Sequence, residues 1–403
     1  MPNKIVIIGA GFAGVWSALS ARRLITLMHK EGDIEIIVIA PEPALTLRPR
    51  LYEPNPSIMK QPLLPLFTSA GIKFAQGTVE AIDTNLQSVH VKSASGVESD
   101  IGYDRLILAA GSAVVRPKSV TGLEQHAFDI DSVAGATKLE THLRSLDSLP
   151  DSKARNTVVV CGGGFTGIEI ATELPNMLKF IDTPRIVLVE SAPDVGPELG
   201  EGPRPTIMKA LNSLGVELKL NASVSGIDKN GVDLSTGERI EAMTVIWTAG
   251  VRATPLTQQI PGRRDLLSRL YVDQDLRVRD CEHVFATGDA AHAVTDTQGN
   301  VTLMSCQHAV VLGRFSGHNA AAELLGEPTL PYSQPGYDTC LDLGPWGAIL
   351  TNGWDREVTI TGQVAKQVKK YVNQKVIMVP ENAKDALYAA RQTWESGVEE
   401  HLD

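Results

Sequence analysis

Two glycine-rich turns of the form Gly-x-Gly-x-x-Gly constrain this chain of 403 residues more than any other feature. The turns span residues 9–14 and 162–167, and each follows a β-branched run typical of a strand buried in a parallel sheet. Each precedes a segment, 15–27 or 168–180, with the apolar spacing of a helix. Such a unit predicts a dinucleotide site, because the glycines let the backbone approach a pyrophosphate at the helix N-terminus. The predicted phosphate-binding residues are Gly9, Gly11, Phe12, Ala13, Gly14, Gly162, Gly164 and Gly167.

The repeat extends beyond the turns, which indicates two similar domains rather than a short-period array. A second apolar strand follows each turn, at 35–40 in one half and at 185–190 in the other. Each half later reaches an apolar strand that ends in small residues. At these strand ends, Ala110, Gly111 and Gly250 are predicted to contact the nucleotides.

The order of these segments predicts an α/β fold with two Rossmann-like domains, the second inserted in the first, and a C-terminal α+β segment. An unmatched strand at 283–289 is expected to return the chain to the first sheet. The predicted boundaries are 1–115 and 256–330 for the two parts of the first domain, 116–255 for the inserted domain and 331–403 for the C-terminal segment.

An acid at the end of the second strand is expected to hold the ribose of a bound nucleotide. Glu190 stands there in the second half, 28 residues after Gly162 (190 − 162). A carboxylate at this place favours the free 2′-hydroxyl of NADH and repels the 2′-phosphate of NADPH; the alternative is a solvated glutamate at a strand end. The first half has Ala40 at the matching position, and whether Glu42 replaces the missing acid stays open.

A third nucleotide contact is predicted at Gly288 and Asp289, in a Thr-Gly-Asp turn. The aspartate can accept a hydrogen bond from a sugar-like hydroxyl while neighbouring N–H groups face a phosphate. The alternative is a simple helix cap. Arg48 is expected to place positive charge near the nucleotide, with plain salt bridges as the alternative.

Charge and cysteine usage exclude several functions. The net charge is −10, without a basic stripe of the kind that nucleic-acid binders show. No apolar stretch approaches the roughly 18 residues that a membrane-spanning helix needs. The four cysteines lie far apart, so we expect reduced cytosolic chemistry and no redox disulfide, and no metal site is predicted.

The combined motifs resemble the flavoproteins with two dinucleotide-binding domains, and among them the type II NADH:quinone oxidoreductases. The resemblance rests on residues 163–169, 244–252 and 284–291, with support from 307–309 and 313–314, and it covers about 1–330. It implies FAD in the first domain, NADH or, less favoured, NADPH in the inserted one, and a quinone or similar small electron acceptor.

The resemblance also implies two catalytic residues, Glu169 and Gln307, and a third candidate, His308, lies beside Gln307. Glu169 corresponds to the acid that such enzymes place beside the nicotinamide and the acceptor, although a helix dipole also favours an acid in a first turn. Gln307 corresponds to a quinone-side Ala-Gln-x-Ala-x-Gln motif, which here reads Cys-Gln-His-Ala-Val-Val over 306–311 and lacks the second amide. His308 is predicted to relay protons, because its ordinary pKa lies near 6.5, or to be a structural histidine.

Residues of the C-terminal segment indicate whether the protein contacts a membrane. Its cations and tryptophans form a candidate membrane-facing surface, but the chain ends in acids, so a solvated face is favoured. An amphipathic helix is expected over 383–395. The cations and tryptophans are Lys366, Lys369, Lys370, Lys375, Trp346 and Trp354, and the acids are Glu395, Glu399, Glu400 and Asp403.

Together these observations predict an FAD-dependent enzyme that oxidises NADH and passes electrons to a quinone or similar acceptor. The alternatives are a soluble NAD(P)H-dependent flavin reductase for a small metabolite or carrier protein, and a slow redox-sensing flavoprotein. The expected location is the cytoplasm, with the inner face of the membrane as the alternative, and a homodimer is left open.

Overall fold

The first glycine turn joins the central strand of a five-stranded parallel sheet to helix α1 (Phe12–Leu27), in a computed structural model that describes residues 2–392. The strand order is β20-β9-β1-β2-β5. The β-branched strand β1 is paired on both sides, which is why its last four residues are buried. The strands are β1 (Asn3–Ile8), β2 (Ile34–Ala40), β5 (Lys73–Gln76), β9 (Arg105–Leu108) and β20 (Val284–Ala286).

The second glycine turn occupies the same place in a four-stranded parallel sheet, between β11 and helix α6 (Phe165–Met177). The order is β13-β12-β11-β17, and all five residues of β11 are buried. Helix α6 begins and ends three residues earlier than the helix expected over 168–180. The strands are β11 (Thr157–Cys161), β12 (Arg185–Val189), β13 (Val216–Lys219) and β17 (Thr244–Trp247).

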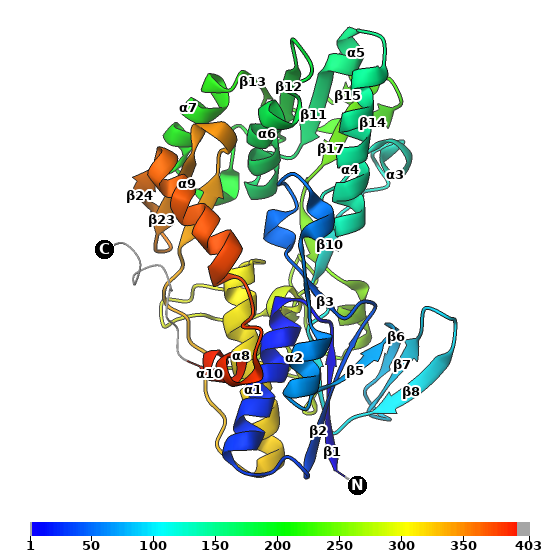
Figure 1. Ribbon diagram of the computed structural model, residues 1–403, viewed down its shortest axis with the longest axis vertical. Coiled ribbons are helices and arrows are strands. Elements are labelled where there is room, and N and C mark those ends of the chain that lie inside the picture. The colour runs from blue at the N-terminus through cyan, green and yellow to red at the C-terminus, as the bar shows by residue number, and fades with distance from the viewer. Residues whose placement is uncertain (1, 393–403) are drawn as a thin grey trace.

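Strand β20 shows that the second sheet is an insertion in the first. It follows all strands of the second sheet in sequence but pairs in parallel with β9 of the first, which confirms the expectation for residues 283–289. Each parallel sheet with its helices forms one lobe. The chain passes from the first lobe to the inserted lobe and back through two antiparallel strands, β10 (Ser112–Val114) and β18 (Val251–Ala253). The elongated molecule in Figure 1 has the inserted sheet at one end and the first sheet at the other.

The two halves share more elements than the sequence repeat indicates. Both halves carry a three-stranded antiparallel sheet between the third and fourth strands of the parallel sheet, which the sequence analysis does not predict. These strands are β6 (Thr78–Asp83), β7 (Ser88–Lys92) and β8 (Glu98–Gly102) in the first half, and β14 (Val224–Asp228), β15 (Gly231–Leu234) and β16 (Arg239–Glu241) in the second.

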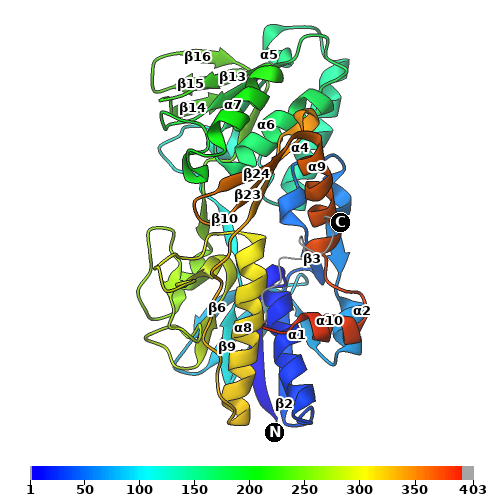
Figure 2. The same ribbon diagram turned by 90° about the vertical axis from the view of Figure 1, so that its left-hand side faces the viewer.

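The C-terminal segment is α+β, as predicted. An antiparallel sheet of β22 (Thr339–Asp342), β23 (Ala348–Asn352) and β24 (Glu357–Thr361) leads into α9 (Gly362–Tyr371) and a π-helical turn, η8 (Val372–Val376). In Figure 2, α9 lies beside the inserted lobe and α10 (Ala383–Ala389) beside α1 of the first lobe.

Helix α10 is shorter than the helix expected over 383–395. After Ala389 the chain leaves the helix, and the Gln392 side chain donates to Ser20 Oγ at 2.7 Å. The acids at 395, 399, 400 and 403, and the last part of the expected helix, lie outside the described residues.

The remaining elements connect these layers. The helices are α2 (Leu64–Ser69), α3 (Leu123–His126), α4 (Val133–Ser145), α5 (Lys153–Asn156), α7 (Arg204–Ser213) and α8 (Cys306–Leu325). The short strands are β3 (Ala44–Thr46), β4 (Lys60–Pro62), β19 (Leu270–Tyr271) and β21 (Ala291–His292). The 3₁₀ turns are η1 (Arg48–Arg50), η2 (Pro56–Ile58), η3 (Leu146–Ser148), η4 (Pro197–Leu199), η5 (Pro255–Gln259), η6 (Gly288–Ala290) and η7 (Gly344–Trp346).

Candidate active site

The first glycine turn leaves open space at the N-terminus of α1. A Cβ on Gly9, which has a φ of +110°, would lie 2.3 Å from Ala109 O, and one on Gly14 would lie 1.9 Å from Gly9 O. By contrast, no described atom outside the turn lies within 4 Å of a Cβ built on Gly11, and no described side chain caps the helix there. Helix N–H groups beside open space fit the pyrophosphate of FAD.

The Thr-Gly-Asp turn packs against this site. A Cβ on Gly288 would lie 2.8 Å from Ala13 Cβ at the start of α1. The Asp289 carboxylate accepts a hydrogen bond from Ser112 Oγ at 2.6 Å, and Arg48 Nη1 lies 3.5 Å from it. Burial raises the pKa of Asp289. Because the carboxylate turns to Ser112 rather than to backbone N–H groups, the helix-cap alternative is not what the structure has.

Arg48 lies between two acids. It forms ion pairs with Asp131 and Asp289 and donates to Ser112 Oγ at 2.9 Å. The structure has the salt bridges that the alternative describes, and positive charge near the nucleotide stays a prediction. Glu42, by contrast, is exposed and pairs with Lys60 of β4.

The second glycine turn carries a buried acid. Glu190, at 9% exposure, follows β12 and accepts hydrogen bonds from Gly163 N at 2.7 Å and Ala192 N at 2.8 Å. The alternative of a solvated glutamate is thus wrong. A Cβ on Gly167 would lie 1.8 Å from Gly162 O, so the strand and helix of this unit meet as closely as in the first.

The small residues after the two fourth strands also match. Gly111 follows β9 and Gly250 follows β17, with φ values of +69° and +89°, and no described atom beyond their neighbours lies within 4 Å of either Cβ position. Ala110 lies beside Gly111, and Ala109 O faces Gly9. Both strand ends therefore face open space next to a glycine turn.

Glu169 is buried in an ion pair. Its carboxylate lies 2.9 Å from Lys369 Nζ and accepts a hydrogen bond from Asp342 N at 3.1 Å. Glu169 is 4% exposed and Lys369 5%. Since α6 begins at Phe165, Glu169 lies in the second turn, and the helix dipole no longer explains its place.

Burial controls the protonation of this pair. Burial raises the pKa of Glu169 to about 7, although the charge of Lys369 opposes the rise. Burial alone would lower the pKa of Lys369, but the Glu169 carboxylate beside it raises that pKa overall. The glutamate can therefore hold or release a proton near neutral pH, while the lysine stays charged.

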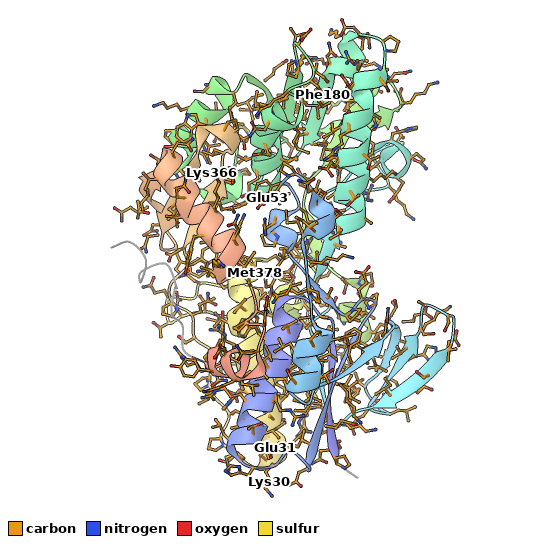
Figure 3. The ribbon with its side chains drawn as sticks, viewed as in Figure 1. Lys30, Glu31, Glu53, Phe180, Lys366 and Met378 are labelled. Atoms are coloured by element: carbon orange, nitrogen blue, oxygen red, sulfur yellow. The ribbon has the colours of Figure 1, made fainter. Side chains whose placement is uncertain are left out.

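Lys369 lines a cavity of about 370 Å³ between α6, α9 and the segment after η1, and its partner Glu169 lies behind it. Asp342, at its edge, pairs with Lys366 and accepts from Tyr52 OH at 3.0 Å. Figure 3 labels Lys366 and Glu53, which line the cavity from α9 and from the segment after η1. Charged side chains of both signs thus surround a space that adjoins the buried Glu169.

Lys369 corrects the prediction of a solvated basic face. The lysine and Ala365, four residues before it, form the buried side of α9. Lys370 and Lys375 are exposed as expected, whereas Lys366 is half-buried in its pair with Asp342. The i, i+4 spacing of Ala365 and Lys369 is the signal that could have identified the buried lysine.

The start of α8 holds two buried polar atoms without hydrogen-bond partners among residues 2–392, Gln307 Oε1 and His308 Nε2. His308 Nδ1 accepts from Leu303 N at 3.2 Å, and the ring stacks on Tyr337 at 4.6 Å. Burial lowers the pKa of His308 to about 3. The ring is therefore neutral at pH 7, and the pKa near 6.5 behind the expected proton relay does not apply.

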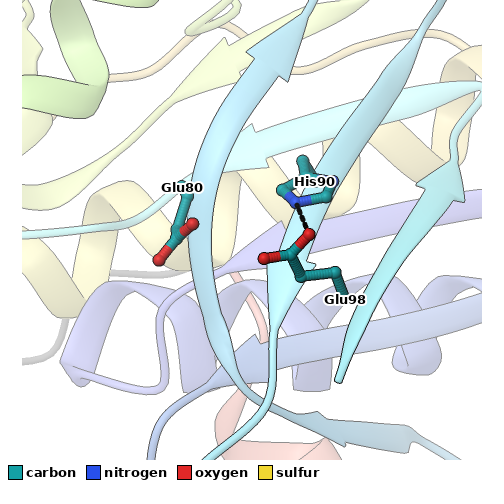
Figure 4. Close-up of side chains that lie close together, drawn as sticks. All are labelled: Glu80, His90 and Glu98. Carbon is teal, nitrogen blue, oxygen red and sulfur yellow. Dashed lines mark ion pairs between the residues drawn. The ribbon is translucent and has the colours of Figure 1, made fainter. Parts of the chain in front are cut away.

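The four cysteines, Cys161, Cys281, Cys306 and Cys340, are free thiols. One group among the described residues has the ligand types of a cation site: Glu80, His90 and Glu98 on the sheet of β6, β7 and β8 (Figure 4). Lys92 Nζ lies 3.7 Å from Glu80 and 3.8 Å from Glu98, so these exposed carboxylates already have a cation beside them. The expectation of no metal stays a prediction.

Two dinucleotide-binding sheets, one inserted in the other, define the chain as a two-domain flavoprotein that uses pyridine nucleotide. The profile of the family described as pyridine nucleotide-disulphide oxidoreductase matches residues 3–313. The chain belongs to this family, whose members bind FAD and a pyridine nucleotide, and it is an NAD(P)H-dependent flavin oxidoreductase.

Individual relatives agree with this assignment. The chain is 41% identical over 391 residues to an NADH dehydrogenase-like protein of Mycobacterium tuberculosis, covering 95% of this chain and 96% of that protein. It is 28% identical over 358 residues to a type II NADH:quinone oxidoreductase of the same species, covering 80% and 73%. The structure of NDH2 from Plasmodium falciparum in complex with NADH matches over 97% of both chains, with a TM-score of 0.75 at 15% identity, and shows the same fold.

Proposed function

We propose that this enzyme oxidises NADH with FAD as its cofactor and passes the electrons to a quinone. The observation that carries the proposal is the buried pair of Glu169 and Lys369 beside a cavity lined by both signs of charge. The printed names of similar proteins, an NADH dehydrogenase-like protein and a type II NADH:quinone oxidoreductase, support it.

The choice of NADH over NADPH rests on Glu190. Backbone N–H groups fix its carboxylate over the second glycine turn. The remaining lone pairs of the carboxylate can accept the ribose hydroxyls of NADH. The 2′-phosphate of NADPH would bring negative charge against a buried carboxylate, which is unfavourable.

The first turn is proposed to hold FAD, with its pyrophosphate over Gly11 and a sugar-like hydroxyl at Asp289. FAD, when bound, accepts hydride from NADH and delivers electrons to a second acceptor. Reduction of a quinone to a quinol also consumes two protons. Glu169, with a pKa of about 7, can hold one of them near the cavity at neutral pH.

The α8 residues are proposed to face the acceptor. Gln307 Oε1 and His308 Nε2 are buried groups in need of a partner, and a bound ligand would supply one. His308 then acts as a neutral hydrogen-bond donor rather than as a proton relay, since Nδ1 already accepts from Leu303 N.

The location follows from the acceptor. No helix within residues 2–392 is long and apolar enough to cross a membrane. We propose a cytoplasmic enzyme that reaches a lipid-soluble quinone at the inner face of the membrane, with exposed Lys370 and Lys375 as candidate contacts.

The test is a visible spectrum of the purified protein, followed by stopped-flow reoxidation after anaerobic reduction with NADH. Flavin absorbance, bleaching by NADH and reoxidation by a water-soluble quinone faster than by air are expected. Protein that contains no flavin and takes up none from added FAD would refute the proposal. Glu169→Gln should reduce the rate of reoxidation by quinone, and Glu173→Gln, which changes a buried acid that lines the cavity, is its matched control.

One observation favours a different acceptor. The position that would carry the second amide of the quinone-side motif is Val311, which is fully buried and apolar. Without this amide a quinone carbonyl loses a hydrogen-bond donor, so a small metabolite or a carrier protein is the second candidate. Reoxidation no faster with quinone than with air would favour it.

A further inference from the structure

The two glycine turns differ in what lies at the N-terminus of the helix that follows each of them. The first is open at Gly11, whereas the second is covered by the carboxylate of Glu198. Glu198 Oε1 lies 2.6 Å from the position of a Cβ built on Gly164, and it accepts a hydrogen bond from Phe165 N at 3.2 Å. Phe165 is the first residue of α6, so its N–H is one of the groups that a pyrophosphate would use.

The loop that carries Glu198 is anchored on the turn itself. It follows β12, and Gly196 N donates to Gly163 O at 2.8 Å. Leu199, the residue after Glu198, is buried at 3% exposure, while the Glu198 side chain is exposed. Gly196 and Gly200, with φ values of +61° and +78°, flank the η4 turn. The hydrogen bond of Gly196 and the burial of Leu199 thus hold the loop in place, and the exposed Glu198 side chain can turn away from the helix by rotation about its own bonds.

A carboxylate at a helix N-terminus satisfies the free N–H groups and meets the positive end of the helix dipole. These are the interactions that hold a phosphate at the same place. The two anions cannot share the N–H of Phe165. Any nucleotide that binds here must therefore displace Glu198 first.

We propose that Glu198 is an affinity-determining residue, an internal competitor for the pyrophosphate at the second turn. The apparent Kd of a nucleotide equals its intrinsic Kd divided by the fraction of molecules in which Glu198 has left the site. The competitor acts on ligands that carry a pyrophosphate and not on those that lack one. This inference rests on the proposed function, because it takes the second turn as the pyridine-nucleotide site.

The test measures binding of ADP-ribose and of adenosine to the FAD-containing enzyme by calorimetry. Glu198→Gln and Glu198→Ala are expected to bind ADP-ribose about two- to five-fold more tightly than the wild type, the range for one surface carboxylate at a helix N-terminus. Adenosine affinity should not change. Glu201→Gln, which removes another exposed acid from the same loop, is the matched control and should leave both affinities unchanged.

Two results would overturn the inference. Unchanged or weaker ADP-ribose binding in both Glu198 variants, with wild-type unfolding temperatures, would assign the carboxylate a supporting role instead. If Glu190→Ala still weakens binding in that case, the nucleotide site stands and only the competitor fails. Wild-type enzyme that does not bind ADP-ribose would remove the nucleotide from this turn, and the inference with it.

Discussion

The two glycine turns share a backbone and differ in their surroundings. Seven residues after the first glycine of each turn stand Trp16 (16 − 9) and Glu169 (169 − 162), both buried. Trp16 packs under the guanidinium of Arg314, 4.4 Å from the ring centre, whereas Glu169 pairs with Lys369. The same unit thus has open space at its helix N-terminus in one half and a carboxylate over the turn with a buried ion pair in the other.

An alanine in place of the third glycine of either turn should have the largest effect. Each variant should lose one nucleotide and keep the other. In Gly167→Ala the new Cβ would lie 1.8 Å from Gly162 O, and in Gly14→Ala 1.9 Å from Gly9 O. We expect a loss of about 1–3 kcal/mol of stability in each. The first variant should keep its yellow colour and lose NADH binding, and the second should lose FAD. Flavin content and NADH titration measure this, and Gly32→Ala, outside both turns and with open space around its Cβ, is the steric control.

Asp289→Ala should act next most strongly, and on the first site alone. Its buried carboxylate accepts from Ser112 and lies near Arg48, so its loss changes the charge of the FAD site. We expect FAD to bind about ten- to a hundred-fold more weakly, as for hydrogen bonds to a charged group. Dialysis against FAD-free buffer measures this. A variant that stays fully yellow would contradict the role.

Glu190→Ala should change selectivity at the second site. Without the carboxylate, NADPH no longer meets a buried negative charge, and NADH loses hydrogen bonds to its ribose. We expect the preference in kcat/KM for NADH over NADPH to fall about ten-fold. Unchanged selectivity would show that Glu190 does not hold the ribose, and flavin content should equal that of the wild type.

The Glu169 pair predicts a pH dependence that the Trp16 site cannot have. With a pKa of about 7, the protonated form is lost as pH rises through 7, so acceptor reduction should decline there. Lys369→Met removes the charge that opposes the rise, and the decline should move to higher pH. Glu169→Gln should lose this limb of the pH profile, and an identical limb in that variant would exclude Glu169 as its origin.

The raised pKa of Glu169 also makes the stability of the protein depend on pH. The folded pKa of about 7 exceeds the ordinary 4.5, so the folded state binds more protons than the unfolded state between these values. The contribution of this carboxyl to stability is therefore complete below about pH 4.5 and is lost as pH rises to 7. Urea unfolding of the wild type and of Glu169→Gln across this range measures the difference.

The smallest effect is expected at Glu42. It is exposed and paired with Lys60, and exposed pairs contribute about 0.2–1 kcal/mol at most. Glu42→Ala should change FAD affinity less than about two-fold. A loss as large as that expected from Asp289→Ala would show that Glu42 does replace the acid missing at Ala40.

Sequence analysis predicts seven of the nine strands in the two large parallel sheets, because their signals are local, and misses the edge strands β5 and β13. Runs such as residues 157–161 are continuous and β-branched, whereas both helices begin inside their glycine turns, three residues before the predicted starts at 15 and 168. The two small antiparallel sheets were missed because their strands are only three to six residues long; β7 alternates over five residues, whereas β8 carries exposed acids. Glu198 was also missed, since only the folded loop brings it over Gly164.

The pair of Glu169 and Lys369 was beyond prediction for another reason. The two residues lie 200 positions apart (369 − 169) and meet only where α9 packs beside α6. From sequence, the three lysines of α9 indicate a solvated face, and the spacing of Ala365 and Lys369 is a weak local sign that one of them points inward. His308 could be placed by its motif, but its neutral state follows from burial, which a motif does not report.

The crossing between β10 and β18 has a consequence for how such a chain can change. Val114 pairs with Val251, so the inserted lobe leaves and rejoins its host at adjacent positions, about 5 Å apart as neighbouring strands are. An insertion whose ends already touch adds little chain entropy cost to the host. The two valines are therefore the points at which this lobe could be exchanged for another, provided that Lys369 of α9, which pairs with Glu169 of the lobe, is exchanged with it.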